Sequence, residues 1–350
     1  MKLALVIGTR PQAIKVAPIF QEISKYPEIK PVLINTGQHW DNNLWGNILD
    51  ELGVPHPHKN LKCGGGDNIT QISKILVGLK MILEIEKPDN ALIFGDTNST
   101  LASALALYEM NIPFGHVEAG LRENIHRAEE INKKIADHCA TWCFCPTSYA
   151  YDNLRYEGIS SEKLMISGDI TYDTFILFSH LAKSSKYSNY YLCEFHTAHT
   201  ADNKTHLKNI LDALRQTQKT IVWPIHPRVK KRVKEFRLSI PSNIELIEPV
   251  SYLEMLGLIK NSDIVLTDSS GTLKDAFYSK KYSVFMDYTS EYINLIDERY
   301  SILATKKPSA ILSAIKEQIS KEWIEPRKNY FGIGKAANHI LAKISLSNKL

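Results

Sequence analysis

Cysteine is scarce in this chain, and its number is odd. The 350 residues contain only five cysteines: Cys63, Cys139, Cys143, Cys145 and Cys193. A disulfide-stapled secreted domain needs an even and denser set, so we expect no disulfide framework, and a reducing cytoplasm fits. Three of the cysteines follow His138, but no second pair of ligands lies at zinc-finger spacing. Because Trp142 and Phe144 alternate with them, we expect a buried strand and no metal site.

Long apolar runs are also missing. The first segment, MKLALVIGTRP, reaches Gly8 and Pro11 before it is long enough to span a bilayer or to form the core of a signal peptide. It is typical of a first β-strand instead. No amphipathic membrane helix stands out, so we expect a cytoplasmic protein with no membrane partner.

The chain carries no strong charge of either sign. Lys and Arg total 42 and Asp and Glu total 38, which gives a formal net charge of +4. Binding to nucleic acid is therefore not indicated. The basic residues are scattered except in one segment that contains Arg228, Lys230, Lys231, Arg232 and Lys234. That segment fits either a solvated helix face or a phosphate ligand.

Two glycine-rich phosphate motifs are absent as well. Neither GxGxxG nor GxxxxGKS/T occurs, so a dinucleotide site and a Walker-type site lose their main support.

Short apolar runs bounded by Gly, Asp or Asn are abundant, and most are followed by a helical pattern. Hydrophobic residues make up 44% and charged residues 23%, the balance of an ordinary globular protein. The first runs are LALVIG (3–8), PVLINTG (31–37), ALIFGD (91–96), IPFGHVE (112–118), TWCFCPT (141–147) and LMISGD (164–169). They are typical of parallel strands buried on both faces. We therefore predict a doubly wound α/β domain over residues 1–170.

The same pattern restarts after a polar stretch at residues 182–190, which we interpret as a linker. The second set of runs is YLCEFH (191–196), TIVWPIH (220–226), IELIEPV (244–250), DIVLTDSSG (263–271) and YSVFMD (282–287). A second parallel-sheet domain is predicted over residues 188–332, and the segment 333–350 is predicted to pack back on the first domain. Because ligands bind beyond the carboxyl ends of parallel strands, two such domains facing each other predict an interdomain cleft.

Polar residues follow nearly every predicted strand of the first domain. Arg10 comes after the first strand, with Lys15 further on, and Asp96 and Glu118 follow later strands. A carboxylate at the end of a central strand must be paired, hydrated or functional, so Asp96 and Glu118 are candidate catalytic residues. Turn and capping roles explain the neighbouring Thr and Gly residues equally well.

A helical pattern then begins at Glu129 or Glu130 and carries Lys133. A carboxylate at a helix start can serve only as a partner of the helix dipole, or it can face a substrate. Both interpretations of Glu129 remain open.

The second domain offers two further candidate segments. His226 and Arg228 lie just beyond a predicted strand, in IHPR. The segment DSSGTLKD places Ser269, Ser270 and Gly271 at a strand-to-helix turn, where exposed backbone N–H groups and hydroxyls can bind phosphate. A plain serine N-cap is the alternative.

Eight segments together carry a family resemblance. They are GTRPQAIKVAPI, TGQHWDNNL, GDTNSTLASALA, HVEAGLR, AEEINKKIADH, CPT, IHPR and LTDSSGTLKDA. In this order and spacing, which extends over most of the chain, they resemble the non-hydrolysing UDP-N-acetylglucosamine 2-epimerase family. The resemblance implies the GT-B architecture, with two Rossmann-like domains facing a cleft, and a role in supplying precursors for bacterial or archaeal surface polysaccharides.

The chemistry implied by the resemblance is inversion at C2 of a UDP-sugar. A proton leaves C2 while UDP is eliminated in anti fashion from C1, and a 2-acetamidoglucal stays bound until UDP adds back. No cofactor is implied. The resemblance places Asp96, Glu118, Glu129 and His226 among the catalytic residues. It places the following among the residues that bind substrate: Arg10, Lys15, Lys133, Arg228, Ser269, Ser270, Gly271 and Asp275.

The chain departs from the family pattern at several of these positions. Gln12 replaces a usual Glu, Lys133 a usual Arg, and Ser270 a usual Gly. The short loop before Glu129 resembles the branch that includes 2-epimerases of UDP-2,3-diacetamido-2,3-dideoxyglucuronate. The other hypotheses are a hydrolysing epimerase, a UDP-sugar binding protein without catalysis, and a GT-B glycosyltransferase. Family members are commonly dimers, so a homodimer is expected.

Overall fold

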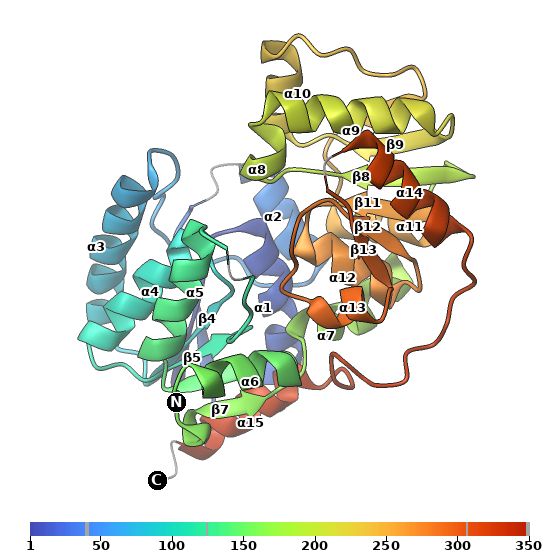
Figure 1. Ribbon diagram of the computed structural model, residues 1–350. Helices are drawn as coiled ribbons and strands as arrows, with labels where there is room; N and C mark the ends of the chain where they lie inside the picture. Colours follow the sequence, from blue (N-terminus) through green and yellow to red (C-terminus); the bar gives the residue numbers. More distant parts are fainter. Residues whose placement is uncertain (39–41, 124, 306, 348–350) are drawn as a thin grey trace. The chain divides into compact units, whose positions relative to one another are not determined.

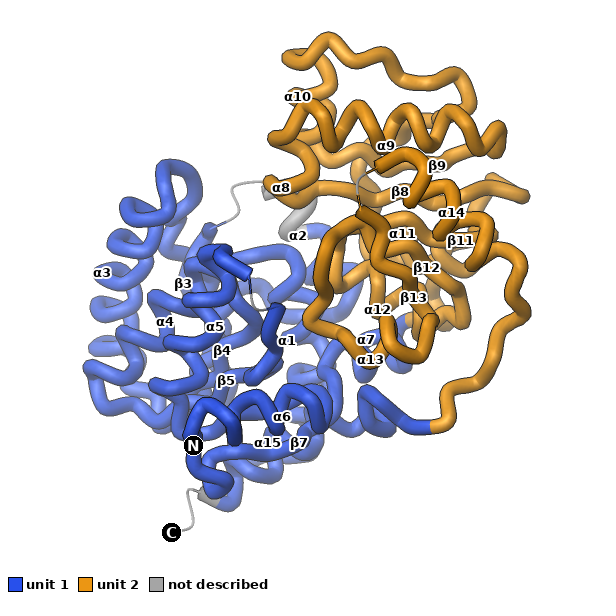
Figure 2. Tube along the Cα trace, viewed as in Figure 1, with its two compact units in different colours: residues 1–178, 328–350 blue, residues 179–327 orange. Residues whose placement is uncertain are grey.

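The computed structural model describes residues 1–38, 42–123, 125–305 and 307–347. The chain forms two compact units, Met1–Phe178 with Lys328–Leu350 as unit 1 and Ser179–Arg327 as unit 2 (Figure 2). Unit 1 therefore extends to Phe178, beyond the predicted limit of the first domain at residue 170, and the chain returns to unit 1 at Lys328 rather than at residue 333. Residues 39–41, within the TGQHWDNNL segment, and residues 348–350 lie outside the described residues.

Over its described residues, unit 1 is built on a seven-stranded parallel sheet with the order β3-β2-β1-β4-β5-β6-β7 (Figure 1). The strands are β1 (Lys2–Ile7), β2 (Lys30–Asn35), β3 (Lys59–Asn60), β4 (Asn90–Phe94), β5 (Phe114–Val117), β6 (Trp142–Cys145) and β7 (Leu164–Ile166). The helices are α1 (Arg10–Ile23), α2 (Asn42–Glu51), α3 (Asn68–Glu86), α4 (Asn98–Glu109), α5 (Ala128–Cys139), α6 (Ser148–Tyr156), α7 (Ile170–Phe178) and α15 (Ala336–Ser347). The chain leaves β1 toward one edge and β4 toward the other, so β1 and β4 flank the switch point.

Unit 2 repeats this plan with six parallel strands in its described part, in the order β10-β9-β8-β11-β12-β13. The strands are β8 (Tyr190–Glu194), β9 (Thr220–Pro224), β10 (Ile244–Ile247), β11 (Ile264–Thr267), β12 (Ser283–Phe285) and β13 (Ser301–Leu303). The helices are α8 (Ala198–Ala201), α9 (Lys204–Gln216), α10 (Pro227–Glu235), α11 (Tyr252–Asn261), α12 (Ser270–Tyr278), α13 (Ile293–Asp297) and α14 (Pro308–Ile319). Its switch point lies between β8 and β11.

The central strands are buried because apolar residues cover both faces of each sheet. Residues 3–7 of β1 and all of β4 are buried, so neither strand shows an alternation of polar and apolar residues. Cys143 and Cys145 lie in β6 with no exposed surface, where burial raises the pKa of both thiols. The predicted fold class, α/β with two doubly wound parallel sheets, is confirmed.

The C-terminal helix α15 packs on helices of unit 1. It contacts α1 and α7, and the Asp173 carboxylate on α7 accepts a hydrogen bond of 2.8 Å from the Ala337 backbone N–H. Asn338 donates to Glu22 of α1 at 2.9 Å. Among the described residues, no helix is both long and apolar enough to cross a membrane.

Candidate functional site

Residue Gln12 ties together the two strand ends at the switch point of unit 1. Its Oε1 accepts hydrogen bonds from the backbone N–H groups of Gly8 (2.8 Å) and Thr9 (3.2 Å), beyond β1. Its Nε2 donates to the Phe94 carbonyl at the end of β4, at 2.6 Å. The amide that replaces the family's usual glutamate therefore supplies a donor to a carbonyl that can only accept.

The Lys15 ammonium and the Glu118 carboxylate form an ion pair beside the end of β4. Lys15 lies on α1, and Glu118 follows β5 directly. Their side chains are 15% and 5% exposed, so water screens this pair only weakly. A Cβ atom on Gly95 would lie 3.0 Å from Lys15 Nζ and 3.7 Å from Glu118 Oε2. The pair therefore sits against the residue that precedes Asp96.

The backbone of Glu118 adopts a left-handed conformation, with φ of 68°. In the described part of the chain, eight other non-glycine residues have positive φ, and all eight are exposed, whereas Glu118 is buried. This conformation costs about 1–3 kcal/mol for a residue with a side chain and persists only where the surroundings enforce it. Such strain is typical of functional sites, which supports a functional role for Glu118.

Residue Asp96 follows Gly95 at the end of β4 and is partly exposed. Its carbonyl accepts a hydrogen bond of 2.9 Å from Asn132 Nδ2 on α5. The structure thus places Asp96, Lys15 and Glu118 at the ends of neighbouring strands β4 and β5.

Substituting Gly95 by alanine tests this arrangement. Gly95 has φ of 68°, where an alanine costs about 1–2 kcal/mol, and the added Cβ would press on Lys15. We expect the thermal unfolding temperature to fall and kcat of the native reaction to fall by about 10- to 100-fold. Thermal unfolding and steady-state kinetics check this. Gly158→Ala, in an equally left-handed turn with no atom within 4 Å of the added Cβ, is the control that should keep kcat.

The two adjacent glutamates in the first turn of α5 have different surroundings. Glu129 is exposed and makes no hydrogen bond or ion pair within the described residues, whereas Glu130 is 3% exposed. Glu130 Oε1 lies 2.9 Å from Lys133 Nζ and accepts a hydrogen bond from the Glu123 backbone N–H at 3.0 Å. Burial raises the pKa of Glu130, but Lys133, the Glu123 backbone N–H and Arg122 together lower it by more. Glu129 is therefore not brought to the Lys15–Glu118 pair, and its catalytic role stays a prediction. Lys133 is held by Glu130.

The predicted substrate residue Arg10 is the first residue of α1. It follows β1 directly, and its side chain is partly exposed.

In unit 2, helix α12 begins at the end of β11 with the predicted phosphate turn. Ser269 is the N-cap, and its side chain accepts from the Thr272 N–H. Ser270 and Gly271 are the first two helical residues, whose N–H groups have no acceptor in a preceding turn. Gly271 is exposed and Ser270 partly so. This end of the helix can bind an anion through its N–H groups and dipole.

A glutamate–histidine pair that was not predicted from the sequence lies beside this turn. Glu194 Oε2 accepts hydrogen bonds of 3.0 Å from the hydroxyls of Thr267 and Thr272, and its Oε1 lies 2.6 Å from His196 Nδ1. Burial lowers the pKa of His196, but Glu194 and, to a smaller extent, Asp268 together raise it by more, to about 9. Burial raises the pKa of Glu194, but the His196 cation and the hydroxyls lower it to about 2. The pair is therefore ionic at neutral pH.

The His226 ring also lies near this pair. It is the exposed N-cap of α10, and its ring centroid is 5.6 Å from that of His196. The structure therefore brings His226 together with the end of β8.

The basic residues of α10 form ion pairs along an exposed helix face. Arg228 lies 3.2 Å and Arg232 lies 2.8 Å from Asp202, and Lys230 lies 2.7 Å from Glu248. These contacts support the solvated-face interpretation of the basic segment. A role of Arg228 in binding substrate stays a prediction.

Residue Asp275 lies two helical turns from the phosphate turn and is 9% exposed. It accepts a hydrogen bond of 3.3 Å from the Tyr252 hydroxyl. The adjacent Lys274 is 2% exposed, with its ammonium 4.8 Å from the Tyr292 ring centroid. Both side chains are held by packing inside unit 2.

The structure adds residues that the sequence reasoning missed, and some signals were available for them. Glu194 ends the apolar run YLCEF, so the rule that selected Asp96 would have selected it. His116 is a polar residue inside the otherwise apolar, buried strand β5, which was a second available signal. Among the described residues, no group of three or more His, Cys, Asp or Glu side chains could hold a metal ion.

Comparison with known proteins gives one consistent family. The family model described as UDP-N-acetylglucosamine 2-epimerase matches residues 21–345. The UDP-N-acetylglucosamine 2-epimerase of Methanocaldococcus jannaschii is 35% identical, over 97% of this chain and 98% of that protein. The UDP-2,3-diacetamido-2,3-dideoxy-D-glucuronate 2-epimerase of Pseudomonas aeruginosa is 33% identical, over 98% and 100%. The crystal structure of the M. jannaschii enzyme with UDP-GlcNAc and UDP is similar with a TM-score of 0.94 and 34% identity, over 99% and 100%.

Proposed function

The chain belongs to the UDP-N-acetylglucosamine 2-epimerase family, and we propose that it interconverts UDP-N-acetylglucosamine and UDP-N-acetylmannosamine by inverting C2. The resemblance inferred from eight sequence segments is thereby confirmed. The observation that carries the proposal is the buried Lys15–Glu118 pair beside Asp96. It provides carboxylates and an ammonium for proton transfer at neutral pH.

The proposed reaction begins with the removal of the C2 proton by a carboxylate of unit 1. The electron pair of the C–H bond forms the C1–C2 double bond, and UDP leaves C1 with the electron pair of the C–O bond. The 2-acetamidoglucal is then reprotonated at C2 on the opposite face while UDP adds back to C1. Asp96, Glu118 and Glu129 remain the candidates for base and acid.

The residues of unit 2 are proposed to hold the UDP group. Backbone N–H groups of Ser269, Ser270 and Gly271 and the two serine hydroxyls are suited to the diphosphate. Arg228 is proposed to add a cationic contact, and His226 stays a candidate catalytic residue. Asp275 is proposed to hold the ribose hydroxyls. Arg10, Lys15 and Lys133 are the substrate-binding candidates of unit 1.

The epimerase proposal is tested by isotope exchange. In deuterated water, UDP-N-acetylglucosamine should gain deuterium at C2 while UDP-N-acetylmannosamine appears, as read by proton NMR. Free N-acetylmannosamine released in step with UDP would show the hydrolysing alternative instead. Tight UDP-sugar binding without exchange on a panel of UDP-hexosamines would overturn catalysis.

A second candidate substrate is UDP-2,3-diacetamido-2,3-dideoxyglucuronate. The observation in its favour is the 33% identity to the P. aeruginosa enzyme of that name. Competition between the two UDP-sugars in one NMR assay ranks them by kcat/KM. A higher kcat/KM for the diacetamido sugar would make it the substrate.

Binding of UDP is expected to weaken above about pH 9. Because its raised pKa is about 9, His196 keeps its charge below that pH and offsets Glu194 beside the phosphate turn. Above that pH, His196 no longer offsets the Glu194 charge beside the phosphate turn, and the dissociation constant of UDP should rise about threefold. Calorimetric titration between about pH 7.5 and 10 checks this. His196→Gln should bind UDP more weakly at pH 7.5 and lose the alkaline change; an unchanged wild-type constant would contradict the prediction.

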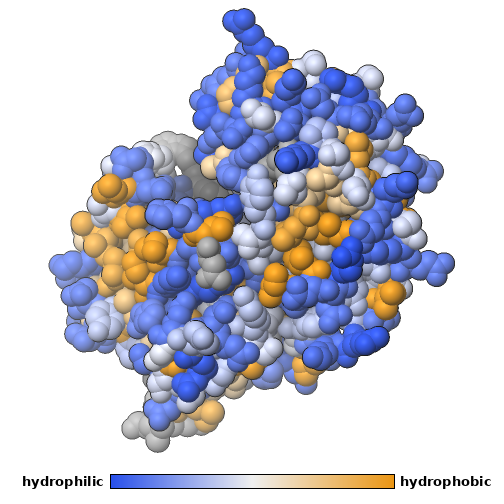
Figure 3. All heavy atoms as spheres, viewed as in Figure 1, coloured by the Kyte–Doolittle hydropathy of each residue, from blue (hydrophilic) through white to orange (hydrophobic). Residues whose placement is uncertain are grey.

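We also propose that the protein forms a homodimer through the outer face of α3. Ile69, Val77, Met81 and Ile85 on that helix are between 61% and 79% exposed. Figure 3 shows apolar residues gathered over the region that Figure 1 assigns to α3 and α4. Patches of this kind mark interfaces. Two α3 helices antiparallel across a two-fold axis would also pair Lys80 of each copy with Glu84 of the other.

The double substitution Val77→Asp and Met81→Lys should convert the dimer to a monomer. Each new charge would have to be buried against the partner helix, which is unfavourable. Light scattering after size-exclusion chromatography measures the mass. Ile166→Asp, at a half-exposed apolar residue of β7, is the matched control that should stay dimeric. A monomeric wild-type protein, or a dimeric double variant, would contradict the proposal.

The cytoplasm is the proposed location. The five cysteines are all free thiols in the structure, which suits a reducing compartment.

A further inference from the structure

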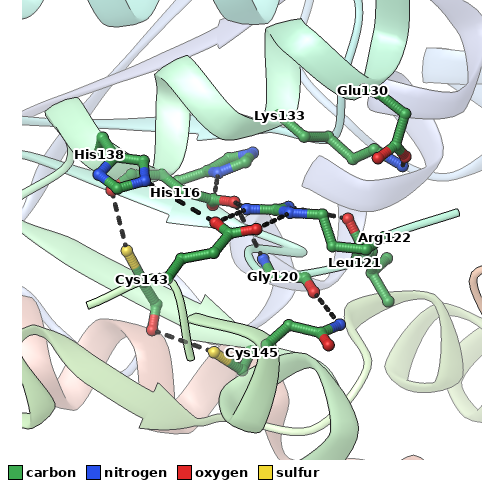
Figure 4. Close-up of polar contacts among 12 residues, drawn as sticks. His116, Gly120, Leu121, Arg122, Glu130, Lys133, His138, Cys143 and Cys145 are labelled. Atoms are coloured by element: carbon green, nitrogen blue, oxygen red, sulfur yellow. Dashed lines mark hydrogen bonds and ion pairs between the residues drawn. The ribbon is translucent and has the colours of Figure 1, made fainter. Parts of the chain in front are cut away.

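A buried charged cluster lies directly behind the strand ends that carry Asp96 and Glu118. His116 on β5 and Asp137 on α5 have no exposed side-chain surface, and Arg122 has 2%. Figure 4 shows His116 and Arg122 converging on one carboxylate beneath α5. None of these three side chains reaches the surface where a substrate could touch it, so their role must act through other residues.

The imidazole of His116 is held at both nitrogens. Nε2 lies 2.7 Å from the Gly95 carbonyl oxygen, and Nδ1 lies 2.6 Å from Asp137 Oδ1. The carbonyl oxygen can only accept, so Nε2 carries a proton and donates. Burial raises the pKa of Asp137, but His116 and Arg122 lower it by more. The carboxylate is therefore ionised at neutral pH and holds Nδ1, so the ring is fixed between α5 and the end of β4.

The other oxygen of Asp137 joins the cluster to the loop after Glu118. Asp137 Oδ2 accepts from Arg122 Nη2 at 2.7 Å and from the Gly120 backbone N–H at 3.3 Å. Arg122 also binds both oxygens of Glu157, at 2.8 Å each. Arg122 thus bridges the carboxylates of Asp137 and Glu157.

The cluster fixes the backbone before Asp96, and Asn132 fixes the backbone after it. The carbonyl of Gly95, which belongs to the peptide group before Asp96, accepts from His116. The carbonyl of Asp96, in the peptide group after it, accepts from Asn132. Asp137 reaches Asp96 through His116 and reaches the Glu118 loop through Gly120. One buried carboxylate therefore connects the backbones of both candidate catalytic residues.

We propose that His116 and Asp137 are positioning residues that set the separation and orientation of Asp96 and Glu118 for the C2 proton transfers. This inference rests on the proposed function for its kinetic readout. A buried ion cluster is poor evidence for stability, because apolar residues of similar volume often stabilise as well or better. The cluster is connected to the ends of both β4 and β5, and the end of β5 carries the strained Glu118 backbone. This connection suits the cluster to positioning Asp96 and Glu118. Proton transfer depends on such positioning, since a displacement of about 1 Å can cost about 10²-fold in rate.

Two substitutions of His116 separate positioning from packing. His116→Phe keeps an aromatic ring but removes both ring nitrogens, so kcat should fall by about 10²-fold with KM changed less than about threefold. His116→Gln can restore a donor to the Gly95 carbonyl, and its kcat should lie within about tenfold of wild type. Asp137→Asn should lower kcat as much as His116→Phe does. It weakens the contact to His116, which holds Gly95, and the contact to the Gly120 N–H in the loop after Glu118.

Asp173→Asn is the matched control. Asp173 is also buried in unit 1, but it pins Ala337 on α15 rather than a strand end. It should leave kcat unchanged. If His116→Phe loses stability but keeps kcat within about threefold of wild type, or if His116→Gln falls as low as His116→Phe, the positioning role is wrong.

A readout without turnover keeps this inference separate from the proposed function. Amide hydrogen exchange at residues 95–98 and 118–121 should quicken in His116→Phe and stay as in wild type in Asp173→Asn. Unchanged exchange in His116→Phe would overturn the positioning role whatever the substrate is. Absence of C2 deuterium exchange in wild type would overturn the proposed function alone.

Discussion

The substitution Glu118→Gln is expected to lower kcat for C2 epimerisation by about 10³-fold, with little change in KM. Glutamine keeps the size and the hydrogen-bonding capacity of the side chain but cannot accept a proton from carbon or neutralise Lys15. Proton transfer by a positioned carboxylate contributes about 10²–10⁴-fold. The buried ion pair with Lys15 and the strained backbone place Glu118 in the upper part of that range.

The measurement is steady-state kinetics together with deuterium incorporation at C2 by NMR. Lys15→Met and the double variant Lys15→Met with Glu118→Gln should lose about as much activity as Glu118→Gln alone, because residues that act as a unit are not additive. Glu22→Gln, on the same helix as Lys15 but paired with Lys25 near the surface, is the control that should retain full activity. A Glu118→Gln enzyme with more than about a tenth of wild-type kcat would exclude an acid–base role.

The largest stability effect is expected for Arg122→Met, which should destabilise unit 1 by about 3–5 kcal/mol. Methionine matches the length of the arginine stem but leaves the buried carboxylate of Asp137 and the partly exposed carboxylate of Glu157 without their shared cation. Removing one partner of a buried ion cluster costs more than the cluster contributes, since the remaining charges stay out of water.

This loss should shrink in acid. The pKa of Asp137 and that of Glu157 are lowered in the folded protein, because His116 and Arg122 outweigh the effect of burial on Asp137, and Arg122 does so on Glu157. A lowered pKa stabilises the fold above the ordinary pKa of the group, and this contribution is lost as the pH falls through the folded-state pKa. Once both carboxyls are protonated, they no longer need the guanidinium. The difference between wild type and Arg122→Met should therefore narrow below about pH 4.

Hydrogen exchange measured by mass spectrometry on peptides of β4, β5 and α5 reports the opening free energy of unit 1 separately from that of unit 2. Arg232→Met on α10 is the matched control, because that guanidinium also contacts two carboxylates, those of Asp202 and Glu235, but at the surface. It should change the opening free energy of unit 2 very little. Equal effects of the two substitutions would contradict the assigned cost of the buried cluster.

Most strands could be predicted, and the exceptions share one cause. The eleven apolar runs named from the sequence each overlap an observed strand, but β3 and β13 were missed. Both are edge strands, of two and three residues. An edge strand is covered less than a central one, so it does not need a continuous apolar run. The unit boundaries at Ser179 and Lys328 depend on which helices pack together, and local patterns report this weakly.

The sequence by itself determined the class of fold and the places where chemistry can occur. Apolar runs that end in polar residues require parallel strands buried on both faces, and such strands align their carboxyl ends at one edge. Asp96, Glu118 and the turn at Ser269 could be selected on that basis. Their chemical roles remain predictions that the proposed variants test.

Only the tertiary structure decided which neighbours these residues have. It buried Glu130 and exposed Glu129, placed Lys15 on Glu118, and joined His116 to Asp137 across 21 residues of sequence. Periodicity reports which face of an element is buried, but it does not report which distant side chain meets it there. A buried charge is tolerated only when its partner arrives with the right geometry, and packing of separate elements around the switch points supplies that partner.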